Sequence, residues 1–199
     1  GALQLADGRF LSWSTDGTLL LWSVEGEAIG EPWRGHDHEV TGALQLADGR
    51  VLSWCLNRTL RLWSEAGEAI GEPWGGHEDE VSGALLLADG RVLSWSSDRT
   101  LRLRSEAGDA IGEPWGGHKD GVSGALQLAD GRVLSWSLEK TLGLLRMWSV
   151  EGETIGKPWR GHKNSVTGAL QLADGRVLSW SKDRTLRLWT LQGEAIGRP

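Results

Sequence analysis

The sequence contains no tyrosine, one phenylalanine, one methionine and one cysteine. Because Cys55 is the single thiol, the chain forms no internal disulfide, which is typical of proteins in a reducing compartment. We therefore expect a cytoplasmic protein. No apolar run approaches the roughly 18 residues of a membrane-spanning helix, and no signal-peptide pattern is present, so we expect no membrane association.

Positive charge is also scarce: 21 Lys and Arg stand against 27 Asp and Glu, which gives a net charge of −6. Such a chain has no general electrostatic attraction for a phosphate backbone, so we expect no nucleic acid partner. His36 and His38 lie beside acidic residues, and residues 78–80 are Glu-Asp-Glu, but neither cluster recurs with the spacing of metal ligands. We predict no metal ion and no cofactor.

No segment has the 3.6-residue apolar period of a helix, whereas tryptophan and glycine are abundant, at 13 and 29 residues. The tryptophans mark a repeat. Trp13, Trp54, Trp95, Trp136 and Trp180 follow one another at intervals of 41, 41, 41 and 44 residues. A unit of about 40 residues is too small to bury a core alone, so the five copies must pack against one another.

Each copy is expected to form four short strands. In the second copy, residues 40–46, 51–55, 59–63 and 68–74 alternate in the manner of strands or form short apolar runs. The Asp48-Gly49 dipeptide between the first two runs favours a tight hairpin. Four antiparallel strands with bulky residues on both faces predict a sheet that is buried on both sides, as in a propeller blade.

The repeat resembles the WD40 repeat in three features: a Gly-His pair, a Ser-x-Ser-x-Asp turn and a closing tryptophan. The pairs are Gly35-His36, Gly76-His77, Gly117-His118 and Gly161-His162, and the closing residues are Trp22, Trp63, Trp148 and Trp189. The resemblance implies an all-β fold, a β-propeller of five four-stranded antiparallel blades in one repeat domain, residues 1–199. The expected blades are residues 1–33, 40–74, 81–115, 122–159 and 166–199.

The copies depart from the WD40 pattern at three places. Ser or Thr follows each closing tryptophan where the family has Asp. The third copy has Arg104 in place of the closing tryptophan. The fourth carries three extra residues within 142–146, near Gly143, which are expected to bulge its third strand.

Histidine, serine, aspartate and tryptophan recur together, which raises the alternative of a hydrolase. In the WD40 family these positions form a structural tetrad that satisfies buried polar groups. Recurrence once per blade favours that structural role, because a catalytic triad needs only one set in one cleft. We expect no enzyme activity. The serine of each set is expected on the second strand, as Ser181 in the fifth copy. The alternative is Ser179, which lies on the same face of that strand. The tetrad positions are His36, Asn57, Trp63, His77, Ser96, Asp98, His118, Ser137, Glu139, Trp148, His162, Ser181, Asp183 and Trp189.

A second row of tryptophans precedes the Gly-His pairs: Trp33, Trp74, Trp115 and Trp159. Exposed tryptophans in a row can stack on sugars, so a carbohydrate-binding propeller is one alternative. Burial between blades is the expected role, since large aromatic side chains dominate protein cores.

The copies differ mainly in two loops: the one after Gly-His, and the turn between strands two and three. Since antiparallel strands alternate in direction, these two loops lie on the same side of each blade. Loops on a rigid scaffold commonly carry binding function. The alternative is drift in loops without a structural role. The candidate binding residues are Asp37, His38, Glu39, Glu78, Asp79, Glu80, Lys119, Asp120, Lys163, Asn164, Thr15, Leu56, Ser97, Leu138 and Lys182.

These patterns predict a non-enzymatic scaffold or sensor module that binds a protein or peptide on this loop face. The first alternative is the carbohydrate-binding propeller. The second is a fragment, or an amplified or designed propeller, that only folds and self-assembles. Because the chain begins at Gly1 without Met, we expect it to derive from a longer one. Five blades are expected to close as a monomeric ring, with a homodimer that completes a larger ring as the alternative.

Overall fold

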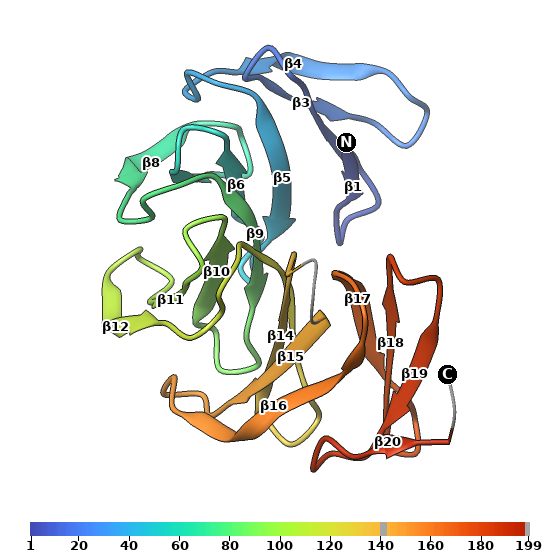
Figure 1. Cartoon of the computed structure of the whole chain (residues 1–199). Helices are drawn as coiled ribbons and strands as arrows, with labels where there is room; N and C mark the ends of the chain where they lie inside the picture. Colours follow the sequence, from blue (N-terminus) through green and yellow to red (C-terminus); the bar gives the residue numbers. More distant parts are fainter. Residues whose placement is uncertain (140–142, 198–199) are drawn as a thin grey trace. The chain divides into compact units, whose positions relative to one another are not determined.

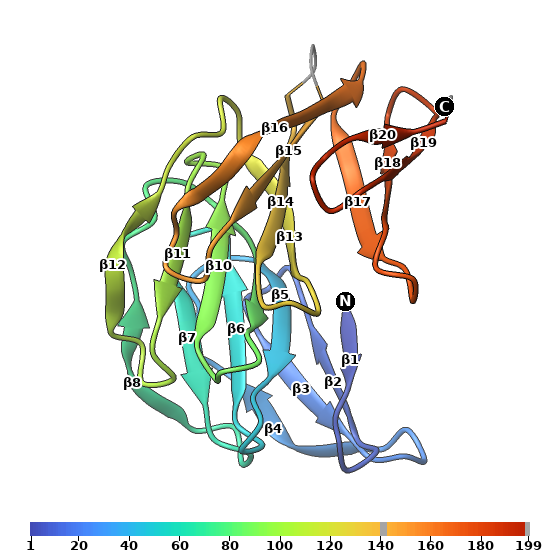
Figure 2. The ribbon, with the colours of Figure 1, turned by 90° about the horizontal axis from the view of Figure 1, so that it is seen from below.

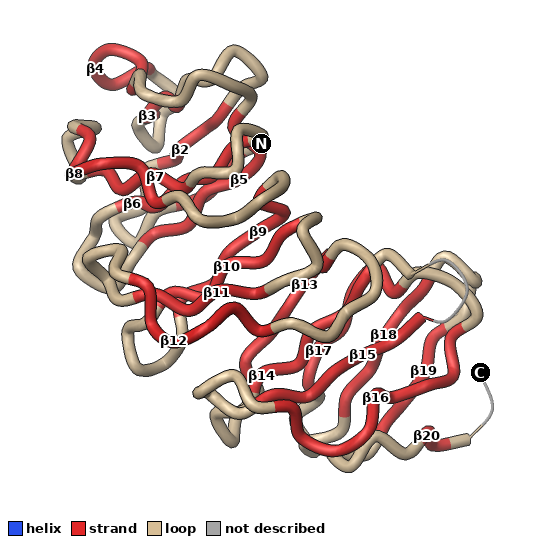
Figure 3. The backbone as a smooth tube through the Cα atoms, turned by 60° about the vertical axis from the view of Figure 1, so that its left-hand side comes forward, coloured by secondary structure: helices blue, strands red, loops and turns tan. Residues whose placement is uncertain are grey.

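The computed structural model describes residues 1–139 and 143–197. All regular elements of this part of the chain are strands, and none is a helix (Figure 3). The strands form five four-stranded antiparallel sheets, and in each sheet the strands are neighbours in chain order (Figure 1). The predicted all-β fold of five four-stranded blades is therefore confirmed, and each sheet is called a blade below.

The chain folds as two compact units, residues 1–94 with 104–109 and residues 95–103 with 110–199. The first unit holds blade 1, which comprises β1 (Ala2–Gln4), β2 (Phe10–Trp13), β3 (Leu19–Trp22) and β4 (Ala28–Trp33). It also holds blade 2, which comprises β5 (Val40–Gln45), β6 (Val51–Cys55), β7 (Leu60–Trp63) and β8 (Ala69–Trp74).

Blade 3 comprises β9 (Val81–Leu86), β10 (Val92–Ser96), β11 (Leu101–Arg104) and β12 (Ala110–Trp115). The second unit holds blade 4, which comprises β13 (Val122–Gln127), β14 (Val133–Ser137), β15 (Gly143–Trp148) and β16 (Thr154–His162). It also holds blade 5, which comprises β17 (Val166–Gln171), β18 (Val177–Ser181), β19 (Leu186–Trp189) and β20 (Ala195–Ile196).

The Asp-Gly-Arg sequence closes the first hairpin of each blade. In blade 1 the backbone N–H of Arg9 donates to Asp7 Oδ1 at 3.0 Å, and the Arg9 guanidinium pairs with the same carboxylate at 2.6 Å. Gly8 has a φ of 91°, in the left-handed region that glycine adopts without steric cost. The same carboxylate-to-backbone bond recurs in all five copies, so the needs of the turn explain why this sequence does not vary.

The core lies between successive blades. Leu11, Leu19 and Leu21 of blade 1 pack with Val51 and Trp63 of blade 2 in one buried cluster. Two further clusters pack in the same way. One draws its buried residues from the range 46–92 in the first unit, and the other from the range 128–189 in the second. Apolar side chains are therefore buried where one blade faces the next, as the repeat length required.

Blade 4, which carries the insertion, has a long fourth strand, β16 (Figure 2). β15 spans six residues where β3, β7 and β19 span four, and its partner β16 spans nine. The register of β15 against β16 shifts between Gly143 and Leu144, whereas its register against β14 is regular. Leu142, part of the predicted insertion, lies outside the described residues.

Candidate functional site

A line of hydrogen bonds joins the Gly-His loop to the strands of a blade. In blade 2, Trp63 Nε1 donates to Ser53 Oγ at 2.7 Å, and Ser53 Oγ lies 2.6 Å from His36 Nε2. Trp148, Ser135 and His118 repeat this line in blade 4 with both distances at 2.7 Å. Trp189, Ser179 and His162 repeat it in blade 5 with both at 2.8 Å.

In blade 5 the line extends further, because His162 Nδ1 lies 3.1 Å from Asp183 Oδ2. A carboxylate only accepts, so Nδ1 carries the imidazole proton and Nε2 accepts from the Ser179 hydroxyl. Asp183 also accepts from the Lys163 N–H at 2.8 Å and from Thr185 Oγ1 at 2.6 Å. Burial acts to raise the pKa of Asp183, but these hydrogen bonds together hold that pKa well below its usual range.

The serine of each line is the one that lies two residues before the turn. The sequence placed Ser96, Ser137 and Ser181 in these sets; instead His77, His118 and His162 meet Ser94, Ser135 and Ser179. The reason is depth along the strand. Ser179 pairs with Arg187 within the sheet, whereas Ser181 ends β18, donates to the Asn164 carbonyl at 2.9 Å and accepts from the Asp183 N–H at 3.0 Å.

Two predicted members of the sets do not extend the line. Asn57 Oδ1 accepts from the N–H of Thr59 at 3.2 Å and from its hydroxyl at 2.5 Å. Glu139 is buried, and its Oε2 has no hydrogen-bond partner among the described residues. His118 Nδ1 likewise has none there, so the aspartate-to-glutamate change in the fourth copy coincides with a shorter line.

These lines suit structure better than catalysis. Ser53, Ser135 and Ser179 are fully buried, and each oxygen lies between an indole and an imidazole. Burial lowers the pKa of His36 to about 4, to which the Arg61 charge adds while Asp37 partly opposes it. A substrate has no path to such a serine unless the blade opens locally.

Burial also raises the pKa of the Cys55 thiol, which favours its protonated form.

The tryptophans before Gly-His are buried in all four copies: Trp33, Trp74, Trp115 and Trp159. The ring centroid of Trp33 lies 5.8 Å from that of Trp63, and Trp115–Trp148 and Trp159–Trp189 repeat this distance. A Cβ added to Gly67 would collide with the Trp33 indole, so a glycine covers this ring. Buried indoles favour the packing role over stacking on sugars.

Blade 3 lacks this ring pair because Arg104 stands where the closing tryptophan is expected. Arg104 is buried, and its guanidinium donates to the carbonyls of Gly75 and Gly108. A cleft of about 430 Å³ adjoins it, lined in part by Trp74, Ile70 and Glu72. A smaller cleft of about 220 Å³ lies at the equivalent position beside Trp159, where the closing residue is Trp189.

In the first unit the predicted binding loops contact one another directly. The Val40 N–H donates to the Ser14 carbonyl at 3.2 Å, and the Leu56 N–H donates to the Glu39 carbonyl at 3.1 Å. A Cβ on Gly17 would lie 2.8 Å from the His36 carbonyl oxygen, which shows how closely the turn and the loop approach. We call these loops, residues 15–17, 37–39 and 56–58, together with residues 78–80 after the next Gly-His pair, the first loop cluster.

In the second unit the corresponding loops form a continuous row. The Leu138 N–H donates to the Gly121 carbonyl at 2.9 Å, the Ser165 hydroxyl donates to the Leu138 carbonyl at 2.7 Å, and the Lys182 N–H donates to the Ser165 carbonyl at 3.0 Å. Gly121 also packs against Ser97. We call residues 97–99, 119–121, 138–139, 163–165 and 182–184 the second loop cluster.

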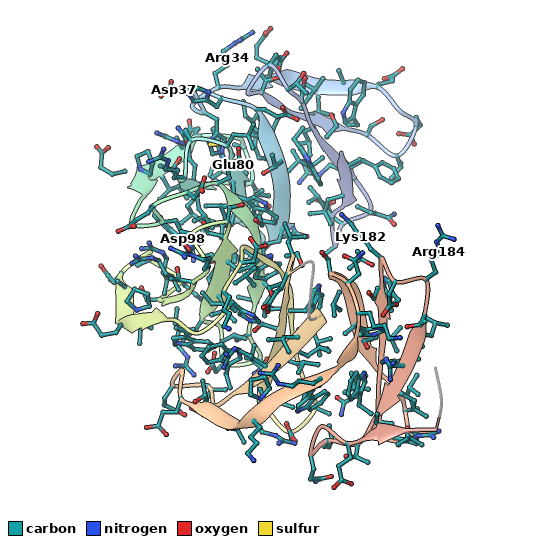
Figure 4. All side chains as sticks on the ribbon, in the orientation of Figure 1. Arg34, Asp37, Glu80, Asp98, Lys182 and Arg184 are labelled. Atoms are coloured by element: carbon teal, nitrogen blue, oxygen red, sulfur yellow. The ribbon has the colours of Figure 1, made fainter. Side chains whose placement is uncertain are left out.

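The two loop clusters differ in charge. In the first, Asp16, Asp37, Glu78, Asp79 and Glu80 are exposed, and Arg58 is its one exposed basic residue among those described. The exposed charged residues of the second are Arg99, Lys119, Asp120, Lys163, Lys182 and Arg184, all basic except Asp120. Figure 4 labels Asp37 in the loop after β4, and Lys182 and Arg184 on the turn between β18 and β19.

Three exposed arginines were not among the predicted binding residues. Arg58, Arg99 and Arg184 have φ values of 74°, 73° and 68°, and the first copy has Gly17 at this position with a φ of 82°. An arginine in this left-handed region costs about 1 kcal/mol relative to glycine. The replacement of Gly17 by arginine in later copies is a signal that sequence comparison between the copies could have found.

The described residues contain no group of three or more His, Cys, Asp or Glu side chains placed to hold a metal ion. They also contain no helix long and apolar enough to cross a membrane.

Five four-stranded blades with recurring His–Ser–Trp lines define a WD40-like β-propeller fold. Among solved structures, the chain is similar to the WD40 β-propeller domain of Doa1, with a TM-score of 0.74 and 23% identity over 95% of this chain. The chain spans 63% of the length of that structure. At this identity the similarity shows the fold. No protein-family model and no curated protein matches the chain.

Proposed function

We propose that the chain is a non-enzymatic binding module, a scaffold or sensor, whose protein or peptide ligand lies on the loop clusters. The observation that carries the proposal is the contact between the loops that differ most among the copies. Backbone hydrogen bonds and the Ser165 hydroxyl join neighbouring loops within each cluster, so the variable side chains of those loops are held in a defined arrangement. A fixed array of varied side chains is what recognition of a protein surface requires.

Charge and backbone conformation support the same proposal. An acidic first cluster and a basic second cluster would select partners of opposite charge and speed their encounter. The left-handed arginines keep an unfavourable conformation at exposed positions, and strain of this kind concentrates at functional sites. The similarity to a WD40 domain supports protein binding as the kind of function, and the buried single thiol agrees with a cytoplasmic location.

The carbohydrate-binding alternative has less support. It depends on accessible rings, whereas Trp33, Trp74, Trp115 and Trp159 are buried between strands and glycines. The hydrolase alternative depends on an accessible hydroxyl, whereas Ser179 is buried beneath Trp189 and His162.

The proposal is tested with peptides selected for binding to the whole chain from a displayed library. Dissociation constants are then measured for the wild type and two charge-reversal variants. The first changes Glu78, Asp79 and Glu80 to Lys, and the second changes Lys163, Lys182 and Arg184 to Glu. We expect at least one of them to weaken binding tenfold or more.

The matched control changes Glu25, Glu27 and Glu68 to Lys, which alters the net charge as much as the first variant does. These residues are exposed and lie at the turns before strand four. Their change should leave affinity within about twofold. Equal affinity of all variants, or an equal loss in the control, would place the ligand elsewhere and contradict the proposal.

A further inference from the structure

Three pairs of successive blades repeat one contact: blades 1 and 2, blades 2 and 3, and blades 4 and 5. The distal face of a blade, which meets the following blade, supplies leucines such as Leu11, Leu19 and Leu21. The proximal face of the following blade supplies Val51 and the closing residue Trp63. Blades 4 and 5 use the same positions: Leu134, Leu145 and Met147 on the distal face, and Val177 and Trp189 on the proximal face.

The distal face of blade 5 breaks this pattern of burial. Leu186 is 58% exposed, whereas Leu19, Leu60 and Leu101 at the same position are fully buried. Leu170 on the same face is 40% exposed. Leu178, Trp180 and Leu188 are only partly buried, although their counterparts Leu52, Trp54 and Leu62 are buried. The sequence of this face is that of a face that packs on another blade.

The proximal face of blade 1 breaks the pattern in the complementary way. Phe10 is 38% exposed, whereas Val51, Val92 and Val133 at the same position are fully buried. Trp22 is only partly buried, although Trp63 and Trp189 at its position are fully buried. An apolar face of this kind in water is unfavourable and marks an interaction surface.

We propose that the distal face of blade 5 binds the proximal face of blade 1 of a second copy of this chain. The two faces are chemically the pair that already packs between blades 1 and 2 and between blades 4 and 5. Leu170, Leu178 and Leu186 take the places of Leu3, Leu11 and Leu19, and Phe10 and Trp22 take the places of Val51 and Trp63.

Such a contact joins two different surfaces, so it is heterologous. It either closes into a ring of copies or adds copies end to end. This inference is independent of the ligand proposed for the loop clusters, since neither face includes a residue from them.

The test is the mass of the purified chain by light scattering across the micromolar range, for the wild type and two variants. We expect the wild type to form dimers or larger assemblies. Leu186→Glu places a charge in the distal face of blade 5, and Phe10→Glu places one in the proximal face of blade 1. Either charge should prevent the two faces from binding, so each variant alone should be monomeric. A mixture of the two should form a heterodimer, because one keeps the proximal face and the other keeps the distal face.

The matched control is Ile29→Glu, which places the same charge at an apolar side chain of the outer strand that is 37% exposed. It should assemble as the wild type does. Circular dichroism and thermal unfolding confirm that each variant is folded. A monomeric wild type at every concentration, or no heterodimer in the mixture of folded variants, would overturn the proposal.

Discussion

At the scale of single residues, the serine hydroxyl is the centre of each buried line. Ser53 accepts a hydrogen bond from Trp63 and lies 2.6 Å from His36, and both partners are buried. A buried polar atom that loses its partner costs about 1–3 kcal/mol. One hydroxyl therefore keeps two other side chains satisfied, and its value exceeds that of a single surface hydrogen bond.

Ser53→Ala is accordingly expected to lower the free energy of unfolding by about 2–5 kcal/mol, since it leaves two buried groups unsatisfied. Chemical denaturation monitored by tryptophan fluorescence measures the change. Ser137→Ala is the matched control, because Ser137 is equally buried but its Oγ has no partner among the described residues. It should cost less than about 1 kcal/mol. Similar losses in the two variants would show that the line does not carry the stability.

At the scale of the element, the closing tryptophan links one blade to the preceding one. The Trp33–Trp63 pair recurs in Trp115–Trp148 and Trp159–Trp189, always at 5.8 Å between centroids. Blade 3 is the exception, with Arg104 beside Trp74 and a cleft of about 430 Å³ next to it. A guanidinium buries less apolar area than an indole, so this blade has the weaker link.

Arg104→Trp is expected to raise the free energy of unfolding by about 1–2 kcal/mol, because an indole adds apolar burial and a ring contact with Trp74. The Gly75 and Gly108 carbonyls that lose their donor are not fully buried, so water can replace the guanidinium. Urea unfolding measures the change. Arg104→Met, which removes the charge without adding a ring, is the comparison; if it stabilises as much as tryptophan does, ring contact is not the cause.

Elements and turns were predictable here because one pattern occurs five times, and each copy corroborates the others. The choice between Ser179 and Ser181 was not, since both lie on one face of β18 and only their depth in the sheet distinguishes them. The exposure of Phe10 and Leu186 could not be predicted from the sequence either. Both fit the repeat, and their exposure depends on what covers each end of the array.

At the scale of the whole molecule, the repeated histidines connect stability to pH. Burial, and secondarily the Arg146 charge, lowers the pKa of His118 to about 3, and burial likewise lowers the pKa of His162, partly offset by Asp183. Each of these histidines is held neutral in the folded chain, whereas in the unfolded chain it titrates near 6.5. Their contribution is fully present above pH 6.5.

As the pH falls below 6.5, the unfolded chain binds protons that the folded chain does not, so stability decreases until the folded histidines titrate. The depressed pKa of Asp183 acts in a lower window, because its contribution is lost only below the unfolded value near 3.8. Between pH 6.5 and about 4 these histidines therefore dominate the pH dependence of the free energy of unfolding. For His36 the loss of stability ends near pH 4, because its pKa in the folded chain is about 4.

Urea unfolding from pH 7.5 to pH 4.5 should accordingly show a free energy of unfolding that falls on the acid side by up to about 1.4 kcal/mol per pH unit for each of His36, His118 and His162. His118→Gln should reduce this slope by one histidine's share. A slope that His118→Gln does not alter would mean that His118 accepts a proton in the folded chain, and the Glu139 carboxylate would then be the first group to examine as its partner.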